Sequence, residues 1–360
     1  MSTLTRINGI QHLGVGTPNL VQSWKWYKSH FGLDIPMFDS VAEAELMKVY
    51  TNDKVVNKRA AMIINIQGGC PIEVIELKSE KCQELPRPIE LGDLGINAGI
   101  VKTNNLKNAI KGFKRLGTPL TNGEVQLPNQ ECAVYLTDPN SLLFQVIESN
   151  DRFWNGPHFT NGVAGCIIGV QNIEQTQAFY GKLGYDKVVY EAEGVFDDFK
   201  GLPGGEHTFK RVRLTQGNAA GGGFGEATGK TWIELIQRLP NHGEFIYKDR
   251  IWGDQGFVHL GFDVKGMPGV EKEFTAIGHP FTCDSSNNLH MGKTRVHCTY
   301  IEDPDKTLIE LIEVYKVPIL EKWGVFLDVQ KRNPLKPLPS WMLKAMRFNK
   351  IKDNYFEKNP

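Results

Sequence analysis

Four short apolar runs recur along the chain, and each of them opens with a glycine. Their sequences are GIQHLGV from Gly9, GINAGIV from Gly95, GVAGCII from Gly162 and GFVHLGF from Gly256. Runs rich in Val, Ile, Leu and Phe that follow a glycine are typical of β-strands. The pattern therefore predicts four strands that open four similar segments of the chain.

A helical pattern follows the first three runs after a polar turn. In the first copy, NLVQSWKWYKSHFGL, apolar side chains recur at helical spacing at Leu20, Trp24, Tyr27 and Phe31, and Gly32 is a suitable stop. This spacing places the four side chains on one face of a helix. The fourth copy, GVEKEFTAIGHPF, shows the same pattern in a weaker form.

Each segment closes with further strands, whose last runs are CPIEVIEL, SLLFQVIES, KTWIELIQR and KTLIELIEV. Two of these runs follow an Asp-Pro turn, at Asp138 and Asp303. Every segment is thus a βαβββ module, with one strand, one helix and about three more strands. The modules cover residues 7–80, 92–150, 160–240 and 254–316. One module leaves a sheet face uncovered, so four modules predict an α+β protein with two paired domains.

In chain order, these modules give an N-terminal domain of residues 1–152, a C-terminal domain of residues 153–318 and a tail of residues 319–360. A glycine-rich stretch, residues 201–229, interrupts the third module and is either a linker or a lid over a site. It lacks the strand and helix context of a phosphate-binding loop. The tail is basic from residue 321 on, and we expect it to pack on its domain, with a partner or membrane contact as the alternative.

Composition narrows the class of protein without identifying an activity. Lys+Arg and Asp+Glu both number 41, so no general basic field points to nucleic acid. The 6 cysteines have no C-x-x-C spacing of the kind that indicates a zinc ribbon. No signal-peptide pattern is evident, and no apolar run approaches the roughly 20 residues that span a bilayer. We expect a cytoplasmic monomer or homodimer that acts on a small molecule, with no membrane span and no nucleic-acid partner.

The fourth module carries a histidine and a glutamate at positions that favour a shared site. His259 lies on the opening apolar run, and Glu310 lies on the closing run DPDKTLIELIE. Alternation along strands lets both side chains point to one face of a sheet, where a metal ion could hold them. A lone histidine on an apolar strand is more often a buried structural residue. The recurrence of a His/Glu pair at matched positions, His12 and Glu73, favours the ligand interpretation.

Together these features resemble the vicinal oxygen chelate superfamily. This superfamily includes glyoxalase I, methylmalonyl-CoA epimerase, extradiol ring-cleaving dioxygenases and the fosfomycin and bleomycin resistance proteins. The four modules, the HLGV and HLGF openings and the DPDKTLIELIE closing carry the resemblance, which covers about residues 7–316. It implies that two modules form a half-open eight-stranded barrel, and that the first and last strands of each module hold one divalent metal at its centre.

The ligand positions that the resemblance implies are filled unevenly. In module order they are His12 and Glu73, Ala98 and Gln145, Gly165 (or Ala164) and Glu234, and His259 and Glu310. Alanine and glycine cannot bind a metal through their side chains, and a glutamine is at best a weak neutral ligand. At most one complete metal site is therefore expected.

The members of that site depend on which modules pair. If modules one and four share a barrel, the ligands are His12, Glu73, His259 and Glu310, the two-histidine, two-carboxylate set that glyoxalase I uses. If neighbouring modules pair, the ligands become Glu234, His259 and Glu310. We favour the first pairing because it gives both His/Glu pairs a common purpose.

Two imidazoles and two carboxylates suit Zn, Ni, Co, Mn or Fe, and not a calcium cage. An ion of this kind polarises a carbonyl, and a glutamate that leaves the ion, Glu73 or Glu310, could take the proton next to it. The first hypothesis is therefore a glyoxalase-like lyase, isomerase or epimerase.

A second hypothesis is an Fe(II) extradiol-type ring-cleaving dioxygenase. CTYIEDPDKTLIEL resembles the signature of those enzymes through Tyr300 and Glu310, and it departs from it at Thr299 and Lys306. A third hypothesis is a protein that binds a small molecule without turnover, as resistance proteins do.

The strand that contains Tyr300 offers further substrate candidates. Arg295 and His297 alternate onto one face of it. If that face looks inward, Arg295 could meet an anionic substrate. A solvated edge is the alternative.

Overall fold

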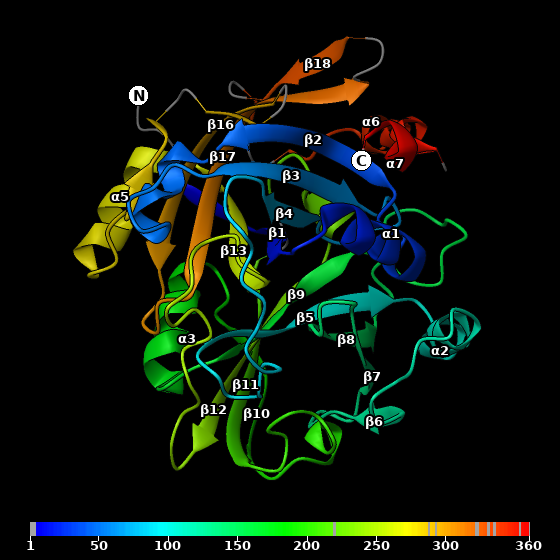
Figure 1. Ribbon diagram of the computed structural model, residues 1–360, viewed down its shortest axis with the longest axis vertical. Coiled ribbons are helices and arrows are strands. Elements are labelled where there is room, and N and C mark those ends of the chain that lie inside the picture. Colours follow the sequence, from blue (N-terminus) through cyan, green and yellow to red (C-terminus); the bar gives the residue numbers. More distant parts are fainter. Residues whose placement is uncertain are drawn as a thin grey trace.

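The computed structural model describes residues 5–218, 221–286, 289–291, 294–320, 324–329, 332–333, 336–352 and 354–359. Its strands form two curled sheets that lie one above the other, with helices packed around them (Figure 1). No helix in this described part of the chain is both long and apolar enough to cross a membrane.

The predicted modules are present, and each contains one opening strand, one long helix and further strands. Module one comprises β1 (Arg6–Gly16), α1 (Leu20–Phe31), β2 (Ile35–Glu43), the short helix η1 (Glu45–Tyr50), β3 (Asn57–Ile64) and β4 (Ile72–Leu77). Module two comprises β5 (Gly95–Thr103), α2 (Leu106–Arg115), β6 (Glu124–Gln126), β7 (Cys132–Thr137) and β8 (Leu143–Glu148).

The second half of the chain repeats this plan. Module three comprises β9 (Val163–Gly169), α3 (Ile173–Lys182), β10 (Lys187–Gly194), η2 (Asp197–Phe199), β11 (Thr208–Thr215), α4 (Gly225–Thr228) and β12 (Trp232–Leu239). Module four comprises β13 (Gly256–Lys265), α5 (Met267–Ala276), β14 (Cys283–Asp284), β15 (Leu289–Met291), β16 (Thr294–Glu302) and β17 (Leu308–Leu320). The tail adds β18 (Val325–Asp328), α6 (Ser340–Ala345), η5 (Met346–Asn349) and α7 (Tyr355–Lys358).

Modules one and four share one sheet, and modules two and three share the other. The first sheet runs β14-β16-β17-β13-β1-β4-β3-β2, with β15 paired to β16 and β18 paired to β17. The second runs β10-β11-β12-β9-β5-β8-β7-β6. The contiguous domains of residues 1–152 and 153–318 are therefore not the units that share a sheet, because each sheet takes one module from either side of residue 152. The pairing of module one with module four is the one that the sequence favoured.

Capping residues explain where three of the long helices begin. Asn19, Asn105 and Asn172 each have extended backbone angles, and each side chain accepts a hydrogen bond from the backbone N–H three residues later. This bond satisfies one of the N–H groups that a helix start leaves without a partner. Helix α1 ends as predicted at Gly32, whose φ of 65° is a left-handed conformation that favours glycine.

The closing strand of every module is tied to the start of its own helix. A side chain on that strand accepts a hydrogen bond from the first N–H of the helix at 2.8 to 3.2 Å. The four acceptors, in module order, are Glu76, Glu148, Gln237 and Glu313. Each lies three residues beyond a predicted ligand position, so this device fixes the strand segment that carries the ligand.

The two Asp-Pro turns join the sheets to each other. Asp138 of module two accepts a hydrogen bond from Tyr27 on α1 at 2.7 Å, and Asp303 of module four accepts one from Tyr180 on α3 at 3.1 Å. Both tyrosines belong to modules of the opposite sheet, and all four side chains are buried. The turns therefore act as cross-links between the two sheets as well as hairpin connections.

Candidate metal centre

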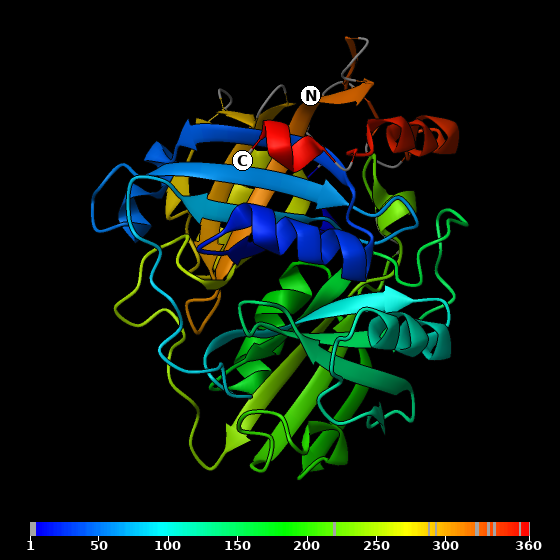
Figure 2. The ribbon, with the colours of Figure 1, turned by 45° about the vertical axis from the view of Figure 1, so that its right-hand side comes forward.

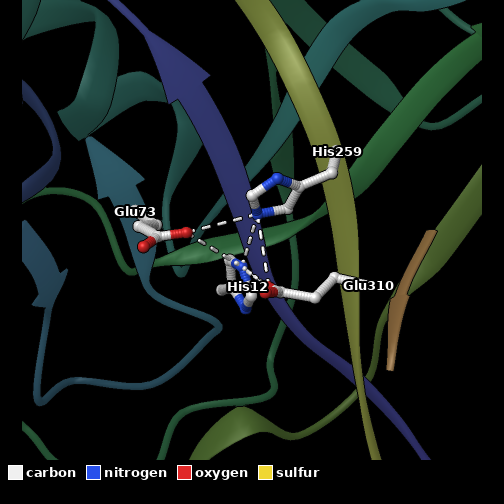
Figure 3. A group of neighbouring side chains, drawn as sticks. All are labelled: His12, Glu73, His259 and Glu310. Carbon is white, nitrogen blue, oxygen red and sulfur yellow. Dashed lines mark hydrogen bonds and ion pairs between the residues drawn. The ribbon is translucent and has the colours of Figure 1, made fainter. Parts of the chain in front are cut away.

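Four polar side chains converge in the interior of the first sheet (Figure 3). His12 lies on β1, Glu73 on β4, His259 on β13 and Glu310 on β17, the central four strands of that sheet. Their potential ligand atoms all lie within 4.8 Å of one another. All four side chains are buried, with at most 1% of each residue exposed. The structure thus brings together the set that the pairing of modules one and four predicts.

The glycine of each HLG motif makes room for the histidine of the other copy. Gly14 pairs with His259, and Gly261 pairs with His12, across the antiparallel ladder of β1 and β13. A Cβ atom on Gly14 would lie 2.5 Å from Nε2 of His259, and one on Gly261 would overlap the ring of His12. The spacing of histidine and glycine in the sequence therefore has a steric cause, because each ring occupies the space above the opposite glycine.

The distances among the four side chains match the edges of a metal coordination shell. Nε2 of His12 lies 2.8 Å from Nε2 of His259 and 3.0 Å from Oε2 of Glu310. Oε2 of Glu73 lies 3.6 Å and 3.3 Å from the Nε2 atoms of His12 and His259. Ligands bound at about 2.1 Å and at right angles to each other are about 3.0 Å apart. The donor set therefore fits one ion of the size of Zn²⁺ or Mn²⁺.

The chemistry of the four groups also suits a bound cation. Oε2 of Glu310 and Oε1 of Glu73 are buried and have no hydrogen-bond partner among the described residues. Burial raises the pKa of Glu310, but the imidazoles of His259 and His12 outweigh it and hold this pKa far below its ordinary value. Burial likewise opposes ionisation of Glu73, while Lys58 and His259 lower its pKa. Two buried carboxylates held in the charged form are typical of a metal site.

Hydrogen bonds orient the ligand groups unequally. Nδ1 of His12 lies 3.1 Å from Oε1 of Gln11, an acceptor, and this contact favours the tautomer that carries the proton on Nδ1 and turns the lone pair of Nε2 toward the cluster. Oε1 of Glu310 accepts from Tyr300 at 2.8 Å and from the thiol of Cys298 at 2.9 Å. Outside the cluster, Glu73 pairs with the ammonium of Lys58, at 3.7 Å from its Oε1. Glu310 is thus firmly held, and Glu73 is the less restrained carboxylate.

Glu234, the alternative third-module ligand, lies in the second sheet on β12 and is not part of this cluster. Its carboxylate is paired with the guanidinium groups of Arg211 and Arg213, both at 2.7 Å. Arg213 also donates to Gln145 at 2.5 Å, so it joins the two closing-strand positions of the second sheet. A protein cation occupies the place where a metal would otherwise balance the carboxylate. The set Glu234, His259 and Glu310 therefore does not form.

The strand register settles which residues replace the missing histidines. In module one, Gly14 on β1 pairs with Glu73 on β4, and the histidine lies two residues before this glycine. In module four, Gly261 pairs with Glu310, and the histidine again lies two residues before the glycine. The same offset in the second sheet gives Ala98 and Gly165. Gly165 has a φ of +136°, and a Cβ atom there would overlap the carbonyl of Trp232. A histidine at this position would therefore require a different backbone.

The substrate candidates on β16 fall on two faces of the strand. Tyr300 and Cys298 point toward Glu310. Because side chains alternate along a strand, Arg295 and His297 point the other way. His297 pairs with Asp284 at 2.5 Å, and the guanidinium of Arg295 lies 5.5 Å from the ring centre of Tyr315. These contacts lie outside the cluster, so the structure favours the alternative in which Arg295 and His297 face away from it.

The sequence interpretation did not identify three residues that contact the centre, namely Gln11, Lys58 and Cys298. Cys298 lies two residues before Tyr300, and that spacing on a strand already places both on one face. Gln11 could have been identified as a candidate from its position next to His12 in the sequence. Lys58 carries no such signal, because its distance from Glu73 depends on the pairing of β3 with β4.

Solved structures of two other proteins share this fold. Glyoxalase I from Zea mays matches with a TM-score of 0.53 and 13% sequence identity, over 85% of this chain and 92% of that chain. A putative dioxygenase from Bacillus subtilis matches with a TM-score of 0.54 and 12% identity, over 86% of each chain. No protein-family model and no curated protein sequence matches the chain. The predicted α+β fold of paired βαβββ modules, that of the vicinal oxygen chelate proteins, is confirmed by these likenesses.

Proposed function

We propose that this protein is a divalent-metal-dependent enzyme that removes a proton next to a carbonyl group of a small molecule. It would be a lyase, isomerase or epimerase of the glyoxalase type. The observation that carries the proposal is the buried cluster of two imidazoles and two carboxylates within 4.8 Å. His12, Glu73, His259 and Glu310 would hold one ion of Zn, Ni, Co, Mn or Fe. When bound, the ion would polarise the substrate carbonyl and so acidify the neighbouring C–H bond.

The surroundings of the two carboxylates support different roles for them. Glu310 accepts two hydrogen bonds from protein groups, from Tyr300 and Cys298, which hold it in one orientation. Glu73 accepts none from the described residues at Oε1, and it lies opposite Met62, a side chain that lines an adjacent cavity. We therefore assign proton abstraction to Glu73. Lys58 would keep that carboxylate ionised between turnovers.

The ring-cleaving dioxygenase is the second candidate, and Tyr300 is the observation that favours it. This tyrosine lies beside the cluster and donates to Glu310. The donor count favours the first candidate, because iron oxygenases of the facial-triad type use two histidines and one carboxylate. The fourth donor, Glu73, lies as close to both imidazoles as a ligand would. Oxygen consumption with a catechol, measured on the Fe(II)-loaded protein, would support the dioxygenase instead.

Metal content tests the proposed site directly. His12→Ala and His259→Ala should each lose most of the metal that the purified wild-type protein retains after dialysis. His297→Ala is the matched control, because this buried histidine faces away from the cluster and should leave the metal content unchanged. Full metal content in both cluster variants would overturn the proposed site. Wild-type protein that takes up none of the five metals would instead support a binding protein without metal chemistry.

Proton abstraction can be measured without knowledge of the natural substrate. Metal-loaded wild-type protein should catalyse exchange of the C–H protons of hydroxyacetone in D₂O, followed by NMR. Glu73→Gln should retain metal, because His12, His259 and Glu310 remain as ligands, and should lose at least about a hundredfold in exchange rate. Equal exchange by the wild type and Glu73→Gln would assign the base elsewhere.

A further inference from the structure

A cavity of about 90 Å³ lies at the first sheet, and neighbours of the metal-centre residues line it, although none of the four cluster residues does so itself. Three of its lining residues place it there. Met62 pairs with Glu73 across β3 and β4, Ile312 stands two residues after Glu310 on β17, and Gln11 precedes His12 on β1. Cross-strand partners and residues two apart share one face of a sheet. The cavity and the carboxylates therefore share the concave face of the sheet.

Two segments outside the four-module pattern cover this cavity. Phe224 and Ala227 of the glycine-rich stretch line it, together with Leu343 and Met346 of the tail. The two segments are joined, because the backbone N–H of Leu338 donates to the carbonyl of Gly223 at 2.9 Å. Figure 2 shows the tail helices, in red, against the first sheet. The loop between β11 and β12, which belongs to the second sheet, thus covers part of a cavity in the first sheet.

The lining of the cavity is mainly apolar and carries almost no charge. Methionine, isoleucine, valine, phenylalanine and leucine side chains make up most of it. Asp263 is the one ionisable side chain among the described lining residues, which include no lysine, arginine or histidine. A ligand with carboxylates or phosphates would meet no cation among these described lining residues, and burying such a group without a partner is costly.

One end of the cavity is polar and has unused hydrogen-bonding capacity. Oδ2 of Asp263 accepts from Nδ2 of Asn8 at 3.0 Å, while Oδ1 of Asn8 is buried without a partner among the residues that the structure describes. Gly222, at a φ of +75°, lets the glycine-rich stretch approach this end, since a Cβ atom there would overlap the Asp263 carboxyl group. Burial raises the pKa of Asp263 to about 7. A buried acceptor without a donor favours a ligand that supplies one.

The polar end lies at a defined separation from the metal centre. Asp263 pairs with Ile312, and Gly261 pairs with Glu310, so the two sites are one ladder step apart on the same face. Two residues of strand span about 7 Å. This separation suits a ligand with a carbonyl at one end, a hydroxyl at the other and an apolar group between them.

Building on the proposed function, we propose that the substrate is an uncharged, mainly apolar carbonyl compound. Its reactive end would meet the ligand cluster, and a hydroxyl at its far end would donate to Asn8 or Asp263. Anionic conjugates, such as those of glutathione or of nucleotides, would be excluded from this cavity.

Three synthetic probes test this class of substrate. Each is an α-hydroxyketone that ends in a phenyl ring, with hydrogen, hydroxyl or carboxylate at the para position. Titration calorimetry on the metal-loaded protein should find that the hydroxyl probe binds at least about tenfold more tightly than the carboxylate probe, the equivalent of one buried hydrogen bond. Equal or tighter binding of the carboxylate probe would overturn the proposal.

Two variants with matched controls locate the binding. Asp263→Asn should reduce the ratio of the affinities for the hydroxyl and carboxylate probes by about tenfold. Asp284→Asn, outside the cavity, should leave this ratio unchanged. Val314→Phe should fill the cavity and weaken all three probes, whereas Val188→Phe, exposed on the second sheet, should not. Unchanged affinities in both cavity variants would overturn the assignment.

Measuring metal content together with probe binding distinguishes a failure of this proposal from a failure of the proposed function. Probe binding to a protein that takes up no metal would leave the cavity assignment intact and refute the metal enzyme. Normal metal content and hydroxyacetone exchange, without discrimination among the probes, would refute the substrate class alone.

Discussion

Replacing Glu234 with glutamine should destabilise the second sheet without releasing metal from the first. The Glu234 carboxylate is fully buried, pairs with Arg211 and Arg213 at 2.7 Å and accepts a hydrogen bond from Tyr190 at 2.6 Å. Glutamine keeps the shape of the side chain and removes its charge. Two buried guanidinium groups then lose their shared anion, and breaking a buried pair in this way typically costs about 3 to 5 kcal/mol.

The pKa of Glu234 gives an independent magnitude. Burial raises this pKa, but Arg211 and Arg213 outweigh it and lower it from 4.5 to about 2. Each pKa unit corresponds to about 1.4 kcal/mol, so the difference contributes about 3 kcal/mol to the free energy of unfolding. Because the folded pKa is the lower one, this contribution is fully present above pH 4.5 or so and is lost as the pH falls toward 2. About 2 kcal/mol should already be lost at pH 3.

Urea unfolding at a series of pH values measures both effects. The wild type should exceed Glu234→Gln by about 3 kcal/mol at pH 7, and the difference should shrink below pH 4.5. Glu193→Gln is the matched control, because its carboxylate is exposed on β10 of the same sheet and the change should alter the stability by less than about 0.5 kcal/mol. A Glu234→Gln protein of normal stability that has lost its metal would refute this reasoning.

Three shorter predictions concern the framework of the centre. Tyr300→Phe should weaken metal binding by about 10- to 100-fold in a competition with a chelator; Tyr135→Phe, the equivalent position of the second sheet, should not. Gly165→Ala should cost at least about 2 kcal/mol in urea unfolding, because the left-handed backbone there excludes a side chain. Glu313→Ala should cost about 1 kcal/mol, because the first N–H of α5, that of Met267, loses its acceptor.

Much of the fold followed from local patterns in the sequence. The four glycine-led strands, the helix from Leu20 to Phe31 and its stop at Gly32 are all features that neighbouring residues specify. The pairing of modules one and four followed from chemistry instead. Only that pairing lets His12 and Glu73 meet His259 and Glu310, and the structure has it. Short-range periodicity therefore predicted the strands and helices, and the distribution of ligand residues predicted which modules pair.

The remainder depended on contacts between distant segments. Arg211 and Arg213 appear in the sequence as charged positions on a strand, which are usually solvated, and nothing local indicates that both are buried against Glu234. The cover of the cavity joins a loop of module three to the tail, more than a hundred residues later. No spacing rule links segments so far apart. The hydrogen-bonded pair of Asn8 and Asp263 could therefore not be recognised from the sequence either.

The second sheet could not regain a metal site through restored histidines alone. Gly165 adopts a backbone that excludes any side chain, and Arg213 already neutralises Glu234 while it bonds to Gln145. A metal would have to displace a guanidinium that is held by two hydrogen-bonded partners. An internal cation therefore balances the buried carboxylate of the second sheet. This sheet still supports the proposed centre of the first sheet, through the bond of Tyr180 to Asp303 and through the glycine-rich loop that lines the cavity.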